Sequence, residues 1–225
     1  MFRKLVLFLF SHRFLAIARW DVHFLSARFC NAVTFQPLRI QRFLATRHAP
    51  LFLNVGSGPR GLDSSHWLNV DGFWDKNVHF VLDLSRPLPL PENLFAGAFS
   101  EHVLEHFTQD DGGRLAREIH RVLVPDGTFR VIVPDAEALL HRYVNSNEEL
   151  VNYRGGTPME VVNSFFHQRY EHQFLYDFET LAAVLKRAGF KSVTKVTCRH
   201  GSVSELAELD DPVYEWESLY VEAKK

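Results

Sequence analysis

The chain has 225 residues, of which 46% are hydrophobic, 23% charged and 13% aromatic. This composition excludes disordered, collagen-like and low-complexity proteins, and the length suits one domain with a full core. The formal net charge of −2 argues against a nucleic-acid binder that works through bulk charge. Two cysteines, Cys30 and Cys198, cannot form a disulfide framework, so the sequence predicts a reducing, cytoplasmic location.

The first 50 residues differ in kind from the rest, because they hold eight basic residues against a single acid, Asp21. Residues 1–48 are predicted to form a helical, basic and aromatic extension that breaks in two near Pro37. The extension either caps the main domain or lies on a membrane surface, with Arg and Lys on anionic lipid and aromatic rings in the interface. The apolar run 5–10 is too short for a signal peptide or a membrane span.

From residue 51 the sequence alternates between short apolar runs and amphipathic stretches. This alternation predicts a three-layer α/β domain over residues 49–225, because parallel strands that are covered on both faces are apolar throughout. The predicted strands cover residues 51–55, 67–71, 78–82, 98–100, 128–133, 191–197 and 218–223, and the main helices cover 112–123 and 177–188.

Glycines follow the first predicted strand, where Gly56 and Gly58 let a ligand lie against the carboxyl end of the strand. Gly61 completes a G-x-G-x-x-G pattern, which by itself indicates a dinucleotide-binding oxidoreductase. However, the next strand begins near Trp67, which leaves no room for the helix that a pyrophosphate requires. The sequence therefore disfavours a nicotinamide-dependent enzyme.

Two acids end the next two predicted strands. Asp71 is suited to accept both hydroxyls of a ribose, and Asp83 is placed to accept from the amino group of an adenine. Each acid could equally serve as a turn residue or a helix cap.

The chain resembles the class I S-adenosylmethionine-dependent methyltransferases, in particular the small bacterial type-11-like members. The resemblance covers residues 51–225 and rests on the runs 53–58, 68–71, 83–84, 99–106, 118–127 and 130–135. It implies a Rossmann-like sheet of about seven strands, mostly parallel with an antiparallel last strand. It also implies S-adenosylmethionine as cofactor, S-adenosylhomocysteine as product, and cofactor contacts from Asn54, Gly56, Ser57, Gly58, Asp71, Asp83, Leu84 and Glu101.

The sequence departs from the family pattern at three places. Asn54 stands where the family usually has an acid, Pro125-Asp126-Gly127 replaces its Pro-Gly-Gly turn, and the first crossover helix is nearly absent. The change at Asn54 leaves open an alternative, in which the chain binds the cofactor but serves as a catalytically silent partner subunit.

Three histidines are candidates for a general base: His102 and His106, which have i, i+4 spacing, and His172. Each of them could instead hold a loop through hydrogen bonds. A metal set of His102, His106, Glu105 and His167 can be drawn, but it lacks the His-Glu-x-x-His order, so no metal site is predicted.

Residues 135–176 are long for a crossover and are predicted to form a lid or substrate insertion that contains aromatic and arginine side chains. The predicted acceptor is a hydroxyl of a small molecule, or of a cell-surface glycan or lipid-linked sugar intermediate, and not a nucleic acid. Because the extension lies outside the resemblance, removal of residues 1–45 is expected to leave cofactor affinity nearly unchanged.

Overall fold

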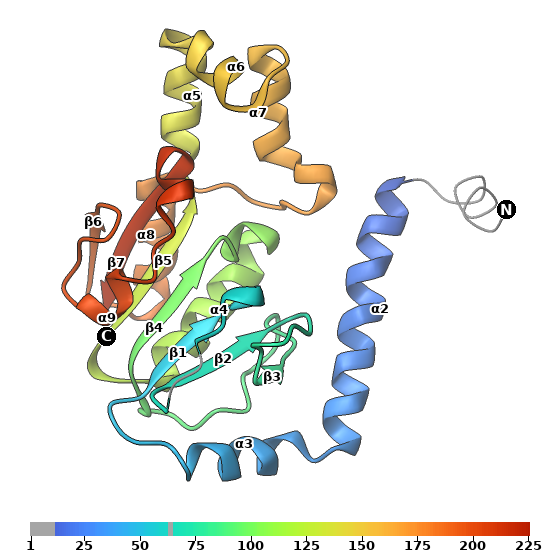
Figure 1. Ribbon diagram of the computed structural model, residues 1–225, viewed down its shortest axis with the longest axis vertical. Helices are drawn as coiled ribbons and strands as arrows, with labels where there is room; N and C mark the ends of the chain where they lie inside the picture. The colour runs from blue at the N-terminus through green and yellow to red at the C-terminus, as the bar shows by residue number, and fades with distance from the viewer. Residues whose placement is uncertain (1–11, 63–64) are drawn as a thin grey trace, which may run out of the picture.

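A computed structural model describes residues 12–62 and 65–225 and shows a seven-stranded sheet in the order β3-β2-β1-β4-β5-β7-β6 (Figure 1). Neighbouring strands from β3 to β5 are parallel, whereas β7 runs antiparallel to both β5 and β6. The predicted Rossmann-like, mostly parallel sheet is confirmed. The apolar run 5–10, interpreted above as neither signal nor span, lies outside the described residues.

Most strands coincide with the apolar runs because both faces of the sheet are covered. The predicted third strand, 78–82, is wrong in length, since only two of its residues pair with β2 at the edge of the sheet. Beyond this pairing, Asn31 and Gln36 of the N-terminal extension donate to the Val81 carbonyl oxygen, each at 2.9 Å. The strands are β1 Phe52–Val55, β2 Trp67–Asp71, β3 Phe80–Val81, β4 Phe95–Glu101, β5 Leu123–Pro134, β6 Ser192–Val196 and β7 Ser218–Lys224.

Two amphipathic helices, α4 (Gln109–Val122) and α8 (Phe178–Ala188), pack against each other and bury their apolar sides in the main core. Side chains cap both helices, because Thr108 accepts from the Asp111 amide and Asp177 accepts from the Thr180 amide. Between β1 and β2 the described residues, 56–62 and 65–66, form the short 3-10 helix η1 (Gly58–Arg60) and no longer helix, which agrees with the prediction that the first crossover helix is nearly absent. Shorter elements are η2 (Leu104–His106), α9 (Ser204–Ala207) and η4 (Pro212–Glu217).

The N-terminal extension forms α2 (His12–Val33) and α3 (Gln36–Leu44), and α2 stands beside the β3 edge of the sheet (Figure 1). The predicted break near Pro37 is present, because Phe35 takes a left-handed conformation and Pro37 lies in the first turn of α3. Within the described part of the chain, we find no helix of the length and apolar character that crossing a bilayer demands.

The predicted insertion folds as three helices and a 3-10 turn beyond the carboxyl ends of the parallel strands (Figure 1). Its elements are α5 (Ala136–Asn145), α6 (Asn147–Arg154), α7 (Pro158–His167) and η3 (Gln168–Tyr170). These helices have an apolar core of their own, formed by Leu139, Leu150, Val161, Val162 and Phe165.

Arg130 on β5 is a fully buried, charged residue near the β7–β6 edge of the sheet. Its guanidinium pairs with Asp210 and with Glu222, the latter at 2.9 Å, and donates to the carbonyl oxygens of Thr197 and His200. The cluster ties the loop after β6 to the centre of the sheet.

We expect Asp210→Ala to lower the free energy of unfolding by about 3–5 kcal/mol, because it leaves the Arg130 guanidinium buried with part of its charge uncompensated. Urea denaturation followed by circular dichroism measures the loss. The matched control is Glu208→Ala, which removes an exposed acid two residues away and should change stability by no more than about 0.5 kcal/mol. A loss below about 1 kcal/mol for Asp210→Ala would contradict this account.

Candidate functional site

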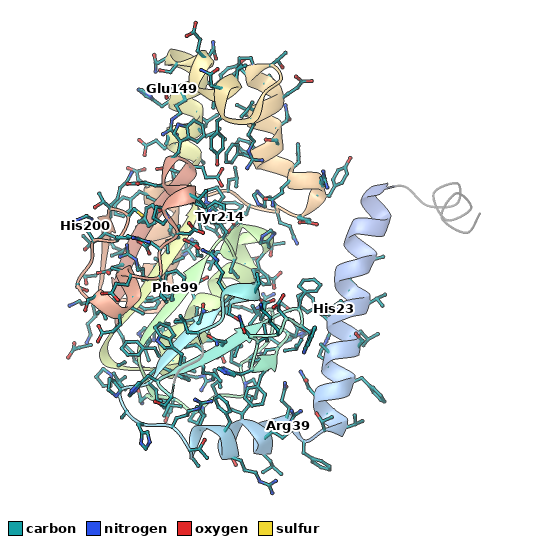
Figure 2. All side chains as sticks on the ribbon, in the orientation of Figure 1. His23, Arg39, Phe99, Glu149, His200 and Tyr214 are labelled. Carbon is teal, nitrogen blue, oxygen red and sulfur yellow. The ribbon has the colours of Figure 1, made fainter. Side chains whose placement is uncertain are left out.

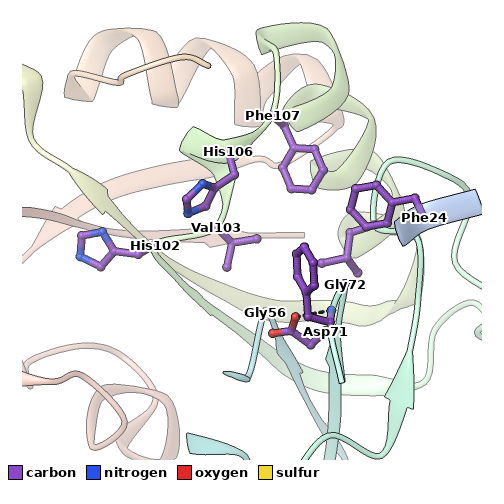
Figure 3. A pocket seen from close by; sticks show the side chains of 10 residues that line it. Phe24, Gly56, Asp71, Gly72, His102, Val103, His106 and Phe107 are labelled. Atoms are coloured by element: carbon purple, nitrogen blue, oxygen red, sulfur yellow. Dashed lines mark hydrogen bonds between the residues drawn. The ribbon is translucent and has the colours of Figure 1, made fainter. Parts of the chain in front are cut away.

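A cavity of about 170 Å³, here called the edge cavity, opens at the carboxyl ends of β1, β2 and β4 (Figure 3). This is the place where open α/β sheets bind ligands, since the loops after successive strands meet there. The cavity is lined by Phe24, Gly56, Asp71, Gly72, Phe73, Leu84, His102, Val103, His106 and Phe107.

Gly56 forms part of the wall and tolerates no side chain. Its φ is +72°, and a Cβ atom there would lie 2.1 Å from Cγ2 of Val103. The backbone is therefore exposed to the cavity at the end of β1, as the glycine pattern predicts.

Asp71 is held rigidly at the end of β2 by two backbone amides. Its Oδ2 accepts from the Gly58 amide at 2.8 Å and its Oδ1 from the Phe73 amide at 2.7 Å. Each carboxylate oxygen has a further lone pair, so the fixed carboxylate suits the two hydroxyls of a ribose.

Asp83 is engaged with the N-terminal extension, although the neighbouring Leu84 lines the edge cavity. One Asp83 oxygen accepts from the amide and hydroxyl of Ser85, and the other lies 3.1 Å from Nε of Arg28 on α2. Contact between the Asp83 carboxylate and an adenine amino group therefore requires Arg28 to give way.

Other predicted cofactor residues lie behind the wall of the cavity. The buried Asn54 side chain faces Asn69, with 3.4 Å between its Nδ2 and Oδ1 of Asn69. Glu101 pairs with Arg60 and accepts from the Asp211 amide at 3.1 Å. Ser57 is buried, and its hydroxyl has no hydrogen-bond partner among the described residues.

His102 lines the edge cavity with a left-handed backbone, φ +54°, which marks strain of the kind found at functional sites. Its Nδ1 lies 3.1 Å from Oε1 of Glu105 and its Nε2 lies 3.0 Å from Oγ of Ser218. Burial favours the neutral ring, but the hydrogen bond and charge of Glu105 outweigh it and raise the pKa of His102. Because both ring nitrogens are engaged, His102 mainly holds Glu105 in place.

His106 also lines the edge cavity, and its Nδ1 lies 3.1 Å from the Glu171 carbonyl oxygen. His172 stands behind it, with the two ring centroids 5.1 Å apart and with its Nδ1 2.5 Å from the Phe165 carbonyl oxygen. Burial lowers the pKa of His172. The structure thus brings His102, His106 and His172 together around the buried Glu105, whereas His167 is exposed at the end of α7.

Sequence reasoning missed the wall that α2 contributes. Phe24 reaches the cavity (Figure 3). His23, labelled on α2 in Figure 2, stacks on Phe73 with 4.2 Å between ring centroids. Nε2 of His23 lies 2.6 Å from the Gly72 carbonyl oxygen. No local pattern marks Phe24, because the extension contains many aromatic residues and only tertiary packing shows which of them faces inward.

Residues 64–131, from the start of β2 into β5, match a family model described as a methyltransferase domain. A putative O-methyltransferase from Nostoc punctiforme PCC 73102 is similar in structure, with a TM-score of 0.50 and 12% identity over 88% of this chain and 60% of that chain. A possible histamine N-methyltransferase from Thermotoga maritima gives a TM-score of 0.46 and 19% identity over 95% and 97% of the two chains.

A phosphoethanolamine N-methyltransferase from Haemonchus contortus, solved with S-adenosylmethionine, gives a TM-score of 0.48 and 15% identity over 84% of this chain and 52% of that chain. No curated protein sequence matches the chain. The likeness to the Nostoc structure concerns the fold alone, while the family match covers the segment that carries Asp71, His102 and His106.

We expect Phe24→Ala to weaken S-adenosylmethionine binding about tenfold, because an aromatic wall against a base is worth roughly 1–3 kcal/mol. This prediction differs from the sequence-based expectation that removal of residues 1–45 leaves cofactor affinity nearly unchanged, because Phe24 of the extension lines the edge cavity. Isothermal titration calorimetry of the full chain measures the change.

The matched control is Phe29→Ala, which removes a ring that is 68% exposed on the opposite face of the same helix. Equal affinities for the two variants and the wild type would remove Phe24 from the cofactor site.

Proposed function

We propose that this chain, a class I methyltransferase that uses S-adenosylmethionine, methylates a hydroxyl of a small molecule or of a cell-surface glycan or lipid-linked sugar. One observation carries the proposal: Asp71, which suits a ribose, and His106, which suits a proton acceptor, line the same cavity from the ends of different strands. The residues fit the nucleoside part of the cofactor, because Gly56 and Asp71 line the cavity together and the Asp71 carboxylate is preorganised by two amides.

Methyl transfer from S-adenosylmethionine mainly requires the protein to place the methyl donor and the acceptor. S-adenosylmethionine supplies a methyl group already activated on a sulfonium, and its transfer leaves S-adenosylhomocysteine. The cavity walls align donor and acceptor and exclude water, which is the larger part of such catalysis. A hydroxyl acceptor also needs a base, because a neutral alcohol is a poor nucleophile.

We assign the base role to His106. Its Nδ1 donates to the Glu171 carbonyl oxygen, and this bond selects the neutral tautomer in which Nε2 accepts a proton. The hydroxyl proton passes to Nε2 of His106 as the acceptor oxygen forms its bond to the methyl carbon and the carbon–sulfur bond breaks. His102 and His172 act behind it: the first orients Glu105, and the second lies against the His106 ring.

The insertion supports a sugar or phosphate-bearing acceptor. Phe166, Arg169 and Tyr170 are exposed where α7 passes into η3, and η3 contacts α2, the helix that contributes Phe24 to the edge cavity. Aromatic faces stack on sugar rings, and arginine forks bind phosphate. We therefore propose that residues 135–176 act as the lid over the acceptor.

The outer face of α2 supports contact with a membrane surface. Val22, Leu25, Phe29 and Val33 follow helical spacing and are 56–68% exposed, while His23 and Asn31 on the other face bond to the domain. An apolar stripe on a strongly basic segment is the pattern of an interfacial helix on anionic lipid. The edge cavity is then within reach of an acceptor that is linked to a membrane lipid.

We expect the full chain to form S-adenosylhomocysteine with a hydroxyl acceptor from a panel of nucleotide sugars, lipid-linked sugars and phenols, and not with matched amines. His106→Ala should lower turnover at least about 100-fold, within the range for loss of a general base, and change cofactor affinity by less than about threefold. Radiolabelled methyl transfer and calorimetry give the two readings. The control is His48→Ala, an exposed histidine that lies outside the proposed lid.

Transfer to amines alone, or full turnover in His106→Ala, would contradict the hydroxyl assignment. Cofactor binding with no turnover on any acceptor would instead favour the silent partner subunit.

We expect the double variant Leu25→Ser, Phe29→Ser to bind phosphatidylserine-containing vesicles more than about tenfold less well than wild type, because each buried apolar side chain contributes about 1.5–3 kcal/mol. Vesicle sedimentation measures the bound fraction. The control is Leu140→Ser, Val144→Ser on α5, where the two side chains are 46% and 74% exposed. Equal binding by both double variants would show that α2 does not face the membrane.

A further inference from the structure

Three side chains with metal-ligand chemistry converge directly behind the edge cavity. Glu105 and His106 come from η2, and His172 comes from the segment that follows η3. One ligand atom from each lies within 4.8 Å of the other two. This group differs from the set that the sequence suggests, because the exposed His167 has no part in it and His172 takes its place.

Backbone carbonyls orient both imidazoles. Nδ1 of His172 donates to the Phe165 carbonyl oxygen, and Nδ1 of His106 donates to the Glu171 carbonyl oxygen. Metal-binding histidines nearly always donate their second ring nitrogen in this way, since the bond fixes the tautomer and makes the ligating nitrogen more basic. In both rings the tautomer so selected carries its lone pair on Nε2.

Glu105 supplies a charge that the protein leaves partly unsatisfied. Its side chain is fully buried. Its Oε1 accepts from Nδ1 of His102, and this bond fixes the orientation of the carboxylate, as hydrogen bonds to metal-binding carboxylates do. Its Oε2 is buried without a hydrogen-bond partner among the described residues. A buried carboxylate oxygen without a donor costs free energy, so the arrangement calls for a positive partner.

We propose that Glu105, His106 and His172 bind one divalent transition-metal ion, with Zn²⁺ as the best match. Two imidazoles and one carboxylate form a donor set typical of catalytic zinc, which keeps a fourth position open. Ligand atoms around zinc lie about 3.3 Å apart, given bonds of about 2.0–2.1 Å, so the side chains need to close in by up to about 1.5 Å. The open position faces the edge cavity, because His106 lines it.

The ion gives the acceptor a defined place, a consequence that rests on the proposed hydroxyl methylation. The acceptor hydroxyl takes the open position, and the ion lowers its pKa as it does for bound water. The hydroxyl proton leaves to solvent, and the oxygen forms its bond to the methyl carbon while the electron pair of the broken carbon–sulfur bond stays on sulfur. With the ion bound, His106 acts as a ligand, and activation of the hydroxyl by the ion replaces the base role assigned to His106 above. His172, which does not line the cavity, becomes necessary for turnover.

The test is a titration of the chelator-treated full chain with Zn²⁺ alone, in competition with a chromophoric chelator. We expect one ion per chain with a submicromolar Kd. Glu105→Gln and His172→Gln should each weaken binding at least about 100-fold, the upper range for loss of even a second-shell partner. His167→Gln, five residues before His172, is the matched control and should bind as wild type does.

Two further readings keep the result interpretable. Circular dichroism shows whether each variant folds, and a Co²⁺ spectrum of the wild type reports a nitrogen and oxygen site even where a variant does not fold. Absence of stoichiometric Zn²⁺ binding, or an equal loss in His167→Gln, overturns the proposal. The same samples are assayed for methyl transfer from S-adenosylmethionine to the hydroxyl acceptors of the panel. Zinc binding without hydroxyl methylation overturns only the proposed function, and methylation without zinc binding overturns only the metal site.

Discussion

The rest of the site depends on residue 105, which joins the cofactor side of the molecule to the insertion. The Glu105 carboxylate is fully buried and held by His102, while its carbonyl oxygen accepts from the amides of Gln173 and Phe174 at 2.8 and 3.2 Å. One residue therefore fixes both the loop that follows β4 and the segment that returns from the insertion. The loop that follows β4 also carries His106. The contacts of residue 105 therefore set the distance between the edge cavity and the insertion.

A buried carboxylate of this kind is stable only if its charge is compensated. Burial alone would raise the pKa of Glu105, but the hydrogen bond and charge of His102, followed by the charges of His106 and His172, lower it below its ordinary value. The same carboxylate raises the pKa of His102. Arg130 solves the corresponding problem for a buried cation, but with two acids and two carbonyl oxygens around it. The hydrogen-bond donors of Arg130 are all used, whereas in the Glu105 cluster Oε2 has no donor within the part of the chain that the structure describes.

The sequence predicted most of the sheet and the parts of the site that depend on local geometry. Gly56 and Asp71 could be placed at one edge of the sheet because the carboxyl ends of successive parallel strands meet there, and both line the edge cavity. The partners of Asp83 and Glu101 were not predictable, because Arg28 and Arg60 reach them from segments with no fixed spacing. These contacts exist only in the folded chain.

The N-terminal extension shows why the spacing of apolar residues does not always predict which face of a helix contacts the protein. A surface helix normally turns its apolar side to the protein, but α2 turns polar His23 and Asn31 inward to backbone carbonyls and leaves Leu25 and Phe29 outside. One helix thus contributes a wall of the edge cavity on one face and the proposed lipid contact on the other. If the cofactor and the lipid surface both bind best when α2 lies against the domain as it does here, each strengthens the binding of the other. The factor is the same in both directions, since coupling between two sites is reciprocal. The membrane surface would then favour the cofactor-bound protein where a lipid-linked acceptor is present.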